Sequence, residues 1–258
     1  MRVTLQAGRS PAIASRPAWA SRRGGYALGV HTAAILPVKR FARAKQRLGE
    51  SVEDSLRLAL AGAMVADVLQ ALADTQAVQR TIVVTMEESV AGAAAELGAV
   101  VVEDAAESGQ SAATALGVRR ALADGFERVL CVPGDCPALD PEELDALLQP
   151  RPGEGLPGVV IVPDRHGTGT NGLLLAPPTA IAPSFGPGSC ERHRALAAAA
   201  GAACRIERAS SLLLDIDTGA DLDALRDRLA GSTARAERTR AVLGGEAPAG
   251  HLSLIGPA

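Results

Sequence analysis

Residues 81–102 read TIVVTMEESVAGAAAELGAVVV, a stretch that predicts a strand, a helix and a second strand in succession. The β-branched run Thr81–Thr85 is typical of a strand that is buried on both faces. A helix is expected near Ser89–Leu97, and the apolar run Ala99–Val102 predicts the next strand. Apolar strands that are separated by helices indicate a mostly parallel sheet covered on both faces.

The same alternation extends through most of the chain. A capping box at Ser51 and Asp54 predicts the start of a long helix, and Asp140-Pro141 predicts the start of another. We therefore predict a three-layer, Rossmann-like α/β fold in a single domain at 31–230, between a disordered, arginine-rich leader at 1–30 and a flexible C-terminal tail at 231–258. The further strands are expected at 33–38, 128–132, 159–162, 173–175 and 212–217, and the further helices at 111–123, 189–200 and 220–229.

The composition of the 258-residue chain excludes several classes of protein. Aromatic residues make up only 2%, too few for the stacking platform of a single-stranded nucleic-acid binder, and the net charge of −3 gives no reason to expect a polyanion as partner. No apolar run approaches the ~18–20 residues that span a bilayer. The four cysteines form no CxxC pair, so we expect buried thiols and a reducing cytoplasm rather than a zinc site or disulfides.

Lysine is concentrated in one short stretch of the chain. Of the 26 basic residues only Lys39 and Lys45 are lysines, and both follow the first predicted strand, together with Arg43 and Arg47. Clustered cations at this position suit a polyphosphate, because they neutralise charge that moves to a leaving pyrophosphate. The stretch is not a P-loop, since the GxxxxGK[ST] pattern is absent. The alternative is a solvated basic surface.

Acidic residues follow two later strands. Asp135 lies in Pro133–Pro137, where a backbone held by prolines presents a carboxylate suited to Mg²⁺; the alternative is a turn in which Asp135 bonds its own backbone. Asp215 and Asp217 are two positions apart, so in a strand both carboxylates face one side. Asp217 is the second predicted magnesium ligand, and the alternative there is helix capping by Asp217 or Thr218.

Two glycine-rich turns predict an anion site. Gly167–Asn171 lies between two strands, and Phe185–Ser189 leads directly into a helix. Such a turn offers free backbone N–H groups to an anion, with Ser189 as helix cap and ligand and with Arg192 and His193 adding positive charge. Cations for a triphosphate, acids for Mg²⁺ and a separate pocket for a phosphate or carboxylate together predict nucleotidyl transfer.

Four motifs occur in a fixed order along the chain: Ile35–Lys39 with Ala44–Leu48, Val132–Leu139, Gly167–Asn171 and Phe185–Ser189. In this order they resemble the 2-phospho-L-lactate guanylyltransferase family, whose bacterial members are phosphoenolpyruvate guanylyltransferases of coenzyme F420 biosynthesis. The resemblance covers about residues 33–229. It implies a nucleotide-diphospho-sugar transferase-like fold, GTP and a phospho-carboxylate as substrates, release of diphosphate, and Mg²⁺ as cofactor. It also implies a downstream enzyme that transfers the product to a deazaflavin, and it leaves a homodimer open.

The resemblance also implies a role for individual residues. Thr170, Gly186 and Ser189 would contact phosphoenolpyruvate or 2-phospho-L-lactate. The catalytic residues would be Lys39 and Lys45, at the GTP phosphates, and Asp135, which holds the metal together with Asp217. The expected nucleotide contacts are Pro37, Lys39, Lys45, Thr85, Gly109 and Ser111.

One loop departs from the family pattern. Many relatives carry Gly-Gly-Leu-Asn in the base-binding loop, where this chain has Ser108–Ala112. Two other functions therefore stay open: another guanylyl- or cytidylyltransferase acting on a molybdopterin or sugar phosphate, and a non-catalytic nucleotide-binding protein. Phosphoenolpyruvate, 2-phospholactate and 3-phosphoglycerate also remain alternative acceptors, because they differ little in shape and charge.

Overall fold

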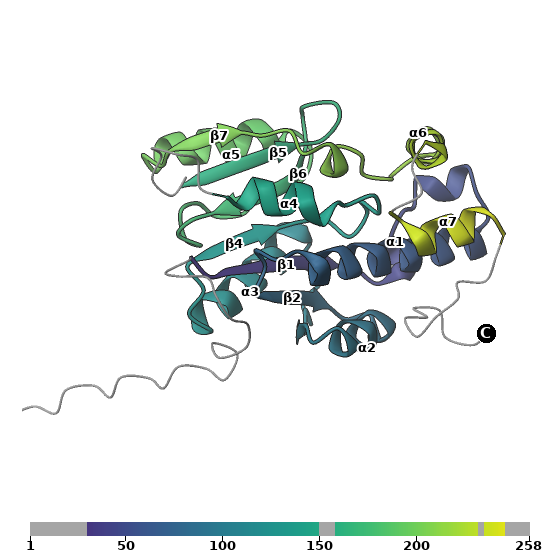
Figure 1. Cartoon of the computed structure of the whole chain (residues 1–258), viewed down its shortest axis with the longest axis horizontal. Helices are drawn as coiled ribbons and strands as arrows, with labels where there is room; N and C mark the ends of the chain where they lie inside the picture. The colour runs from purple at the N-terminus through teal and green to yellow at the C-terminus, as the bar shows by residue number, and fades with distance from the viewer. Residues whose placement is uncertain (1–29, 150–157, 232–234, 246–258) are drawn as a thin grey trace, which may run out of the picture.

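The computed structural model describes residues 30–149, 158–231 and 235–245. The predicted leader at 1–30 lies outside these residues except for Val30, and so does the part of the predicted tail at 246–258. A single domain with one central sheet contains all the described strands (Figure 1).

The sheet has seven strands in the order β3-β2-β1-β4-β6-β5-β7. Strand β6 pairs antiparallel with both β4 and β5, whereas the other neighbouring pairs are parallel. The predicted α/β fold with a mostly parallel sheet is confirmed. The strands are β1 (Thr32–Val38), β2 (Arg80–Thr85), β3 (Val100–Val102), β4 (Arg128–Cys131), β5 (Val159–Pro163), β6 (Thr170–Leu175) and β7 (Cys204–Ile206).

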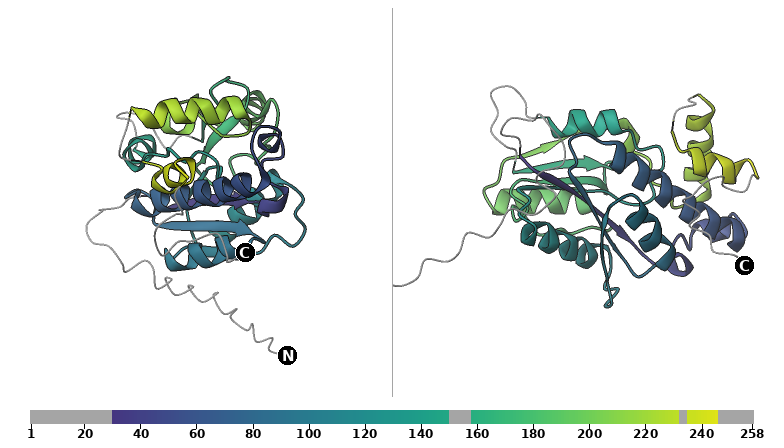
Figure 2. Two further views of the ribbon diagram at one scale, coloured as in Figure 1. Left: turned by 90° about the vertical axis from the view of Figure 1, so that its right-hand side faces the viewer. Right: turned by 60° about the horizontal axis from the view of Figure 1, so that its bottom comes forward.

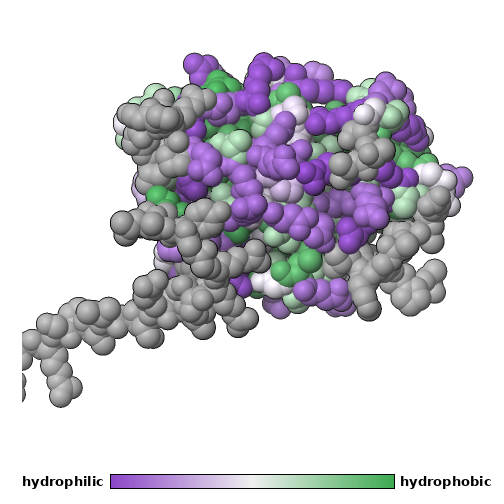
Figure 3. Space-filling view, viewed as in Figure 1, coloured by the Kyte–Doolittle hydropathy of each residue, from purple (hydrophilic) through white to green (hydrophobic). Residues whose placement is uncertain are grey.

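Helices cover both faces of the sheet and complete three layers (Figures 1 and 2). Because side chains alternate along a strand, Ala34 and Leu36 of β1 pack toward α1, α2 and α4, whereas Ala33 and Ile35 pack toward α3 and α5. The surface of the molecule on the α1 and α4 side is mainly hydrophilic (Figure 3). The helices are α1 (Asp54–Asp74), α2 (Glu88–Glu96), α3 (Gln110–Ala123), α4 (Pro141–Leu148), α5 (Ser189–Ala199), α6 (Gly219–Ala230) and α7 (Glu237–Leu243).

Helix α1 is long and apolar enough to cross a membrane by length and composition alone, but 72% of its apolar window is buried inside the protein. It packs against the sheet on one side and against α7 on another. We therefore assign α1 as a core helix. The capping box predicted at its start is wrong: the helix begins at Asp54, after Glu53, and no side chain caps it.

The prediction of a tail from residue 231 is wrong for Glu237–Leu243, which form α7. The carboxylate of Asp67 in α1 accepts hydrogen bonds from the backbone N–H groups of Arg238 and Thr239, at 3.1 and 2.8 Å. Val242 is buried in a third apolar cluster formed with α1 and α6. Two helical turns are too short to show a periodic pattern in the sequence, which explains why the helix was not predicted.

The strand predicted at 212–217 is also wrong. Ser210–Leu212 forms a 3₁₀ turn, and the following residues run as a loop to α6. The backbone N–H of Ile216 donates to the carbonyl of Asp135 at 3.1 Å, so this loop lies beside the loop after β4. The helix capping predicted for Asp217 or Thr218 is confirmed at Thr218, which forms a capping box with Asp221 at the start of α6.

Candidate functional site

A cavity of about 800 Å³ opens at the carboxyl ends of the parallel strands, where open α/β sheets bind their ligands. Loops that follow β1, β3, β4 and β5 line it, together with the start of α5 and the loop before α6. The structure brings most of the predicted site residues to this one cavity. They are Pro37, Lys39, Lys45, Gly109, Asp135, Thr170, Gly186, Ser189 and Asp217.

Thr85 and Ser111 are the two predicted nucleotide contacts that do not line the cavity. The Thr85 hydroxyl accepts a hydrogen bond from the N–H of Glu87 at 2.9 Å and so shapes the turn after β2. The Ser111 hydroxyl accepts from the N–H of Phe185 at 2.8 Å. Ser111 therefore joins the start of α3 to the loop before α5.

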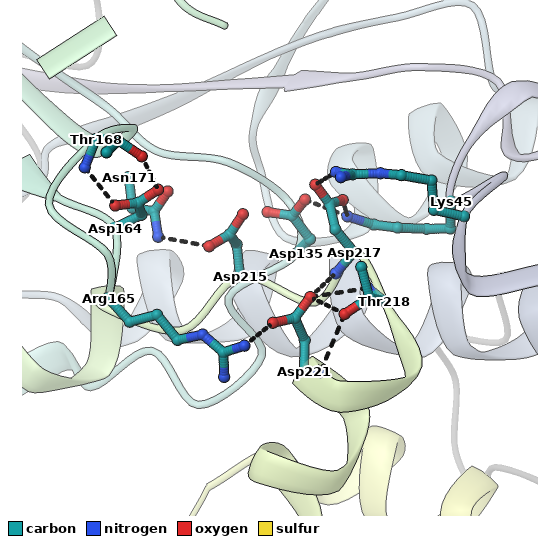
Figure 4. Close-up of polar contacts among 11 residues, drawn as sticks. Lys45, Asp135, Asp164, Arg165, Thr168, Asn171, Asp215, Asp217, Thr218 and Asp221 are labelled. Atoms are coloured by element: carbon teal, nitrogen blue, oxygen red, sulfur yellow. Dashed lines mark hydrogen bonds and ion pairs between the residues drawn. The ribbon is translucent and has the colours of Figure 1, made fainter. Parts of the chain in front are cut away.

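Lys45 is the centre of an ion cluster that lines the cavity (Figure 4). Its side chain is only 10% exposed, and its ammonium group contacts Asp135 and lies 2.8 Å from Oδ1 of Asp217. The guanidinium group of Arg47 lies 2.7 Å from Oδ2 of Asp217. Lys45 has a φ of 56°, a left-handed conformation that costs a non-glycine residue about 1 kcal/mol or more, so the contacts of its side chain hold an unfavourable backbone.

The ion cluster fixes the charge of its members. Burial acts to lower the pKa of Lys45, but the carboxylates of Asp135 and Asp217 outweigh burial and hold that pKa above its ordinary value. Burial acts to raise the pKa of Asp217, but Lys45 and Arg47 outweigh it, so the pKa lies below its ordinary value. The ammonium group and the Asp217 carboxylate are therefore both charged at neutral pH.

A third carboxylate, Asp215, points toward Asp135 (Figure 4). Burial raises the pKa of Asp215, and the nearby charge of Asp135 raises it further, against the effect of a 3.1 Å hydrogen bond from the amide of Asn171. Leu214 and Ile216 are buried on the other side of the loop. The predicted alternation of acidic and apolar residues is thus present, although the segment is not a strand.

The acidic end of the cavity fits a magnesium ion that arrives with phosphate oxygens. Oδ1 of Asp135 is buried and has no hydrogen-bond partner among the described residues, and such an orphaned acceptor is costly unless a ligand satisfies it. Within the same residues, no group of three or more histidine, cysteine, aspartate or glutamate side chains is arranged to hold a metal. One or two carboxylates are what Mg²⁺ uses when phosphates and water complete its shell.

The start of α5 and the loop before it form another part of the cavity wall. Gly186 and Gly188 have φ values of 109° and 70°, which side chains rarely adopt, and Gly188 is the residue that caps the helix. The prediction that Ser189 is the cap is therefore wrong. The N–H of Ser189 donates to the carbonyl of Gly186 at 3.0 Å, and its side chain is buried at the wall of the cavity.

The positive charge predicted for the first turn of α5 is absent at His193. Burial, followed by the nearby charge of Arg192, lowers the pKa of His193 to about 4, so its ring is neutral at pH 7. The Arg192 guanidinium group donates to the carbonyl groups of Ser184 and Phe185, at 3.0 and 3.1 Å, and also to that of Pro187. Arg192 therefore holds the loop before α5 by its main chain.

Two charged residues of the cavity were not singled out from the sequence. Arg165 lines the cavity and lies 2.5 Å from the carboxylate of Asp221. Glu107 also lines it and pairs with Arg40 and Arg43, at 3.4 and 3.2 Å, so the loops after β1 and β3 are tied together. Both residues could have been predicted to line the cavity, because each is a charged residue in a loop at the carboxyl end of a strand.

Comparison with known proteins gives a consistent result. The family described as "Guanylyl transferase CofC like" matches residues 32–238. The chain is 50% identical over 213 residues to a phosphoenolpyruvate guanylyltransferase of Conexibacter woesei, covering 82% of this chain and 95% of the relative. It is 37% identical over 191 residues to a 3-phospho-D-glycerate guanylyltransferase of Phenylobacterium zucineum, covering 73% of this chain and 86% of that relative.

A solved structure supports the fold. The crystal structure of a putative nucleotide-diphospho-sugar transferase from Desulfovibrio desulfuricans G20 superposes with a TM-score of 0.65 and covers 84% of this chain and 95% of that one. At 18% identity the likeness concerns the fold alone. The predicted nucleotide-diphospho-sugar transferase-like architecture is confirmed.

Proposed function

This chain belongs to the CofC-like guanylyl transferase family, and we propose that it transfers GMP from GTP to phosphoenolpyruvate, with release of diphosphate, in coenzyme F420 biosynthesis. The observation that carries the proposal is that one cavity joins the Lys45–Asp135–Asp217 cluster to Thr170 and Ser189. The family membership supports the reaction, and the name of the 50% identical relative supports the acceptor.

In this proposal the nucleotide occupies the end of the cavity formed by the loops after β1 and β3. Lys39 is exposed there and forms no ion pair with any residue that the structure describes, so its ammonium group is available to the GTP phosphates. Pro37 and Gly109 also line the cavity and would contact the nucleoside. Asp135 and Asp217 would hold Mg²⁺, which when bound supplies neutralisation of phosphate charge.

The acceptor would lie at the start of α5, with its phosphate against Thr170, Gly186 and Ser189. One of its phosphate oxygens forms a bond to the α-phosphorus of GTP, and the bond from that phosphorus to the bridging oxygen breaks, so that pyrophosphate leaves with the electron pair. The attacking phosphate is already an anion at pH 7, so no residue has to act as general base. The chain contributes positioning and electrostatic stabilisation.

The partners follow from this reaction. GTP and a small phospho-acid are the proposed substrates, and the proposed downstream partner is the enzyme that transfers the product to a deazaflavin. The cytoplasm is the proposed compartment, because it contains these metabolites. A 3-phospho-D-glycerate acceptor is the second candidate, since a 37% identical relative carries that name.

The test is a pyrophosphate-release assay of the purified full chain with Mg²⁺, in which GTP, ATP and CTP are each combined with phosphoenolpyruvate, 2-phospholactate and 3-phosphoglycerate. The downstream enzyme is added to capture the product. We expect turnover with GTP and phosphoenolpyruvate, and its loss in Asp135→Asn. Asp223→Asn is the matched control, because Asp223 is an exposed residue of α6 that does not line the cavity and forms an ion pair with Arg226. Wild-type pyrophosphate release by Asp135→Asn would show that the proposed role of this carboxylate is wrong.

A further inference from the structure

His193 has both ring nitrogens engaged, although it takes no part in the proposed reaction. The residue is the fifth of α5 and is completely buried. The backbone N–H of Ser184 donates to Nε2 at 2.9 Å, and Nδ1 lies 3.1 Å from the hydroxyl oxygen of Thr170. A backbone N–H can only donate, so Nε2 is the acceptor. The single proton of the neutral ring is therefore on Nδ1, which donates to Thr170.

This assignment determines what the Thr170 hydroxyl presents to the cavity. The side chain lines the cavity, and its oxygen already accepts the Nδ1–H of His193. A hydroxyl group carries one hydrogen, which remains available to donate. Thr170 can therefore donate this hydrogen to a ligand in the cavity, which suits an anionic oxygen.

The same ring also holds the loop that precedes α5. Its bond to the Ser184 backbone fixes one end of the loop, and its edge-to-face contact with Phe185 has a centroid distance of 5.2 Å and an interplanar angle of 76°. Gly186 follows directly in the same loop, and Ser189 begins the helix that carries His193. One buried side chain thus connects β6, the loop and α5, from which Thr170, Gly186 and Ser189 come.

We propose that His193 is a positioning residue for the phospho-acid acceptor: it fixes the Thr170 hydroxyl as a hydrogen-bond donor toward the acceptor's phosphate. This inference rests on the proposed function, because it assigns this end of the cavity to the acceptor. It predicts an effect on acceptor binding that is separate from GTP binding. A histidine that only fills the core would lower stability and affect both substrates alike.

Two substitutions separate the two bonds of the ring. His193→Asn places an amide near the position of Nδ1, where it can still donate to Thr170. His193→Gln places an amide oxygen near the position of Nε2, where it can accept from Ser184 while the bond to Thr170 is lost. Without the His193 bond the Thr170 hydroxyl is no longer oriented toward the acceptor's phosphate. Loss of the hydrogen bond from Thr170 to that charged group corresponds to about a tenfold change in affinity or more. We expect His193→Gln to raise the KM for phosphoenolpyruvate about tenfold, with the KM for GTP within about twofold.

His193→Asn should retain a KM for phosphoenolpyruvate within about threefold of wild type. In a Thr170→Val background, where no hydroxyl is left to orient, His193→Gln should add nothing further to that KM. The matched control is His31→Gln, because His31 precedes β1 at the opposite end of the sheet. Thermal melting checks that each variant folds, and calorimetry with phosphoenolpyruvate alone measures acceptor binding independently of turnover.

The outcomes distinguish this inference from the proposed function. If wild type binds phosphoenolpyruvate but releases no pyrophosphate with any nucleotide, the proposed function fails, while the calorimetric comparison of the variants still decides the role of His193. The role is overturned if His193→Gln raises both KM values equally, or if its effect multiplies with that of Thr170→Val. Should His193→Gln fail to fold, a tenfold loss of acceptor affinity in folded His193→Asn would likewise overturn it.

Discussion

Replacement of Lys45 by methionine removes the buried ammonium group and leaves a side chain of similar length. Asp135 and Asp217 then lose a cation that is only 10% exposed. Removing one partner of a fully buried ion pair costs about 3–5 kcal/mol. Here Asp217 is 37% exposed and keeps its 2.7 Å contact with Arg47, so we expect a smaller loss, about 2–3 kcal/mol in the free energy of unfolding. For a chain of this size that corresponds to a Tm lower by roughly 4–12 °C.

Magnesium should partly reverse this loss. Without the ammonium group, Asp135 and Asp217 present uncompensated negative charge to a cation, and a ligand that binds only the folded state stabilises it by mass action. At about 10 mM Mg²⁺ and a dissociation constant of about 1 mM, the gain is about 1.4 kcal/mol. Wild type should respond less to Mg²⁺ alone, since Lys45 already neutralises the two carboxylates.

The assay is urea unfolding of both proteins in EDTA and in Mg²⁺, without nucleotide. Lys39→Met is the matched control, because Lys39 is an exposed lysine of the same cavity. Its free energy of unfolding should stay within about 0.5 kcal/mol of wild type, although GTP binding should weaken. The reasoning is refuted if Lys45→Met and Lys39→Met unfold together, or if Mg²⁺ stabilises Lys45→Met no more than wild type.

Three further changes test the fold and its pH dependence. Asp67→Ala removes the hydrogen bonds to the first turn of α7; it should cost about 2 kcal/mol in urea unfolding and expose α7 to limited proteolysis. Gly117→Ala would bring a Cβ within 2.4 Å of a β1 side chain and should cost about 1–3 kcal/mol, whereas Gly92→Ala, with open space around it, should be neutral or stabilising by up to about 1 kcal/mol in the same assay. Burial and then Arg192 lower the pKa of His193 from 6.5 to about 4, so the unfolded chain binds the extra proton first. The free energy of unfolding should fall by up to about 3 kcal/mol between pH 6.5 and 4, and stability curves of His193→Gln should lack this contribution.

The position of the site could be predicted because it depends on topology. The apolar runs at Thr81–Thr85 and Val100–Val102 define parallel strands, and parallel strands place the loops at their carboxyl ends along one edge. Lys39, Gly109 and Asp135 follow three such strands, β1, β3 and β4, far apart in sequence, and all line one cavity. No side-chain geometry was needed for that inference.

The secondary structure near the site was predicted less well, because local alternation does not identify a strand. Leu214 and Ile216 are buried while Asp215 and Asp217 face the cavity, which is the pattern of a half-buried strand. A strand also needs a neighbour that pairs with its backbone. Here the N–H of Ile216 bonds to the carbonyl of Asp135 in another loop, and that pairing partner is a tertiary feature that a single segment does not reveal.

The charge states of the site residues could not be predicted from the sequence either, because they depend on tertiary contacts. A histidine beside an arginine near the start of a helix predicts a positively charged site for an anion. His193 is instead buried with both ring nitrogens hydrogen-bonded, so its ring is neutral and contacts Thr170. Two lysines six positions apart suggest one shared role, but their side chains differ in burial and therefore in role. Lys39 faces solvent in the cavity, whereas Lys45 balances two carboxylates. Any phosphate that takes the Lys45 ammonium group from these acids leaves them to be neutralised by another cation. Nucleotide and magnesium should therefore bind to this cavity cooperatively, each weakly without the other.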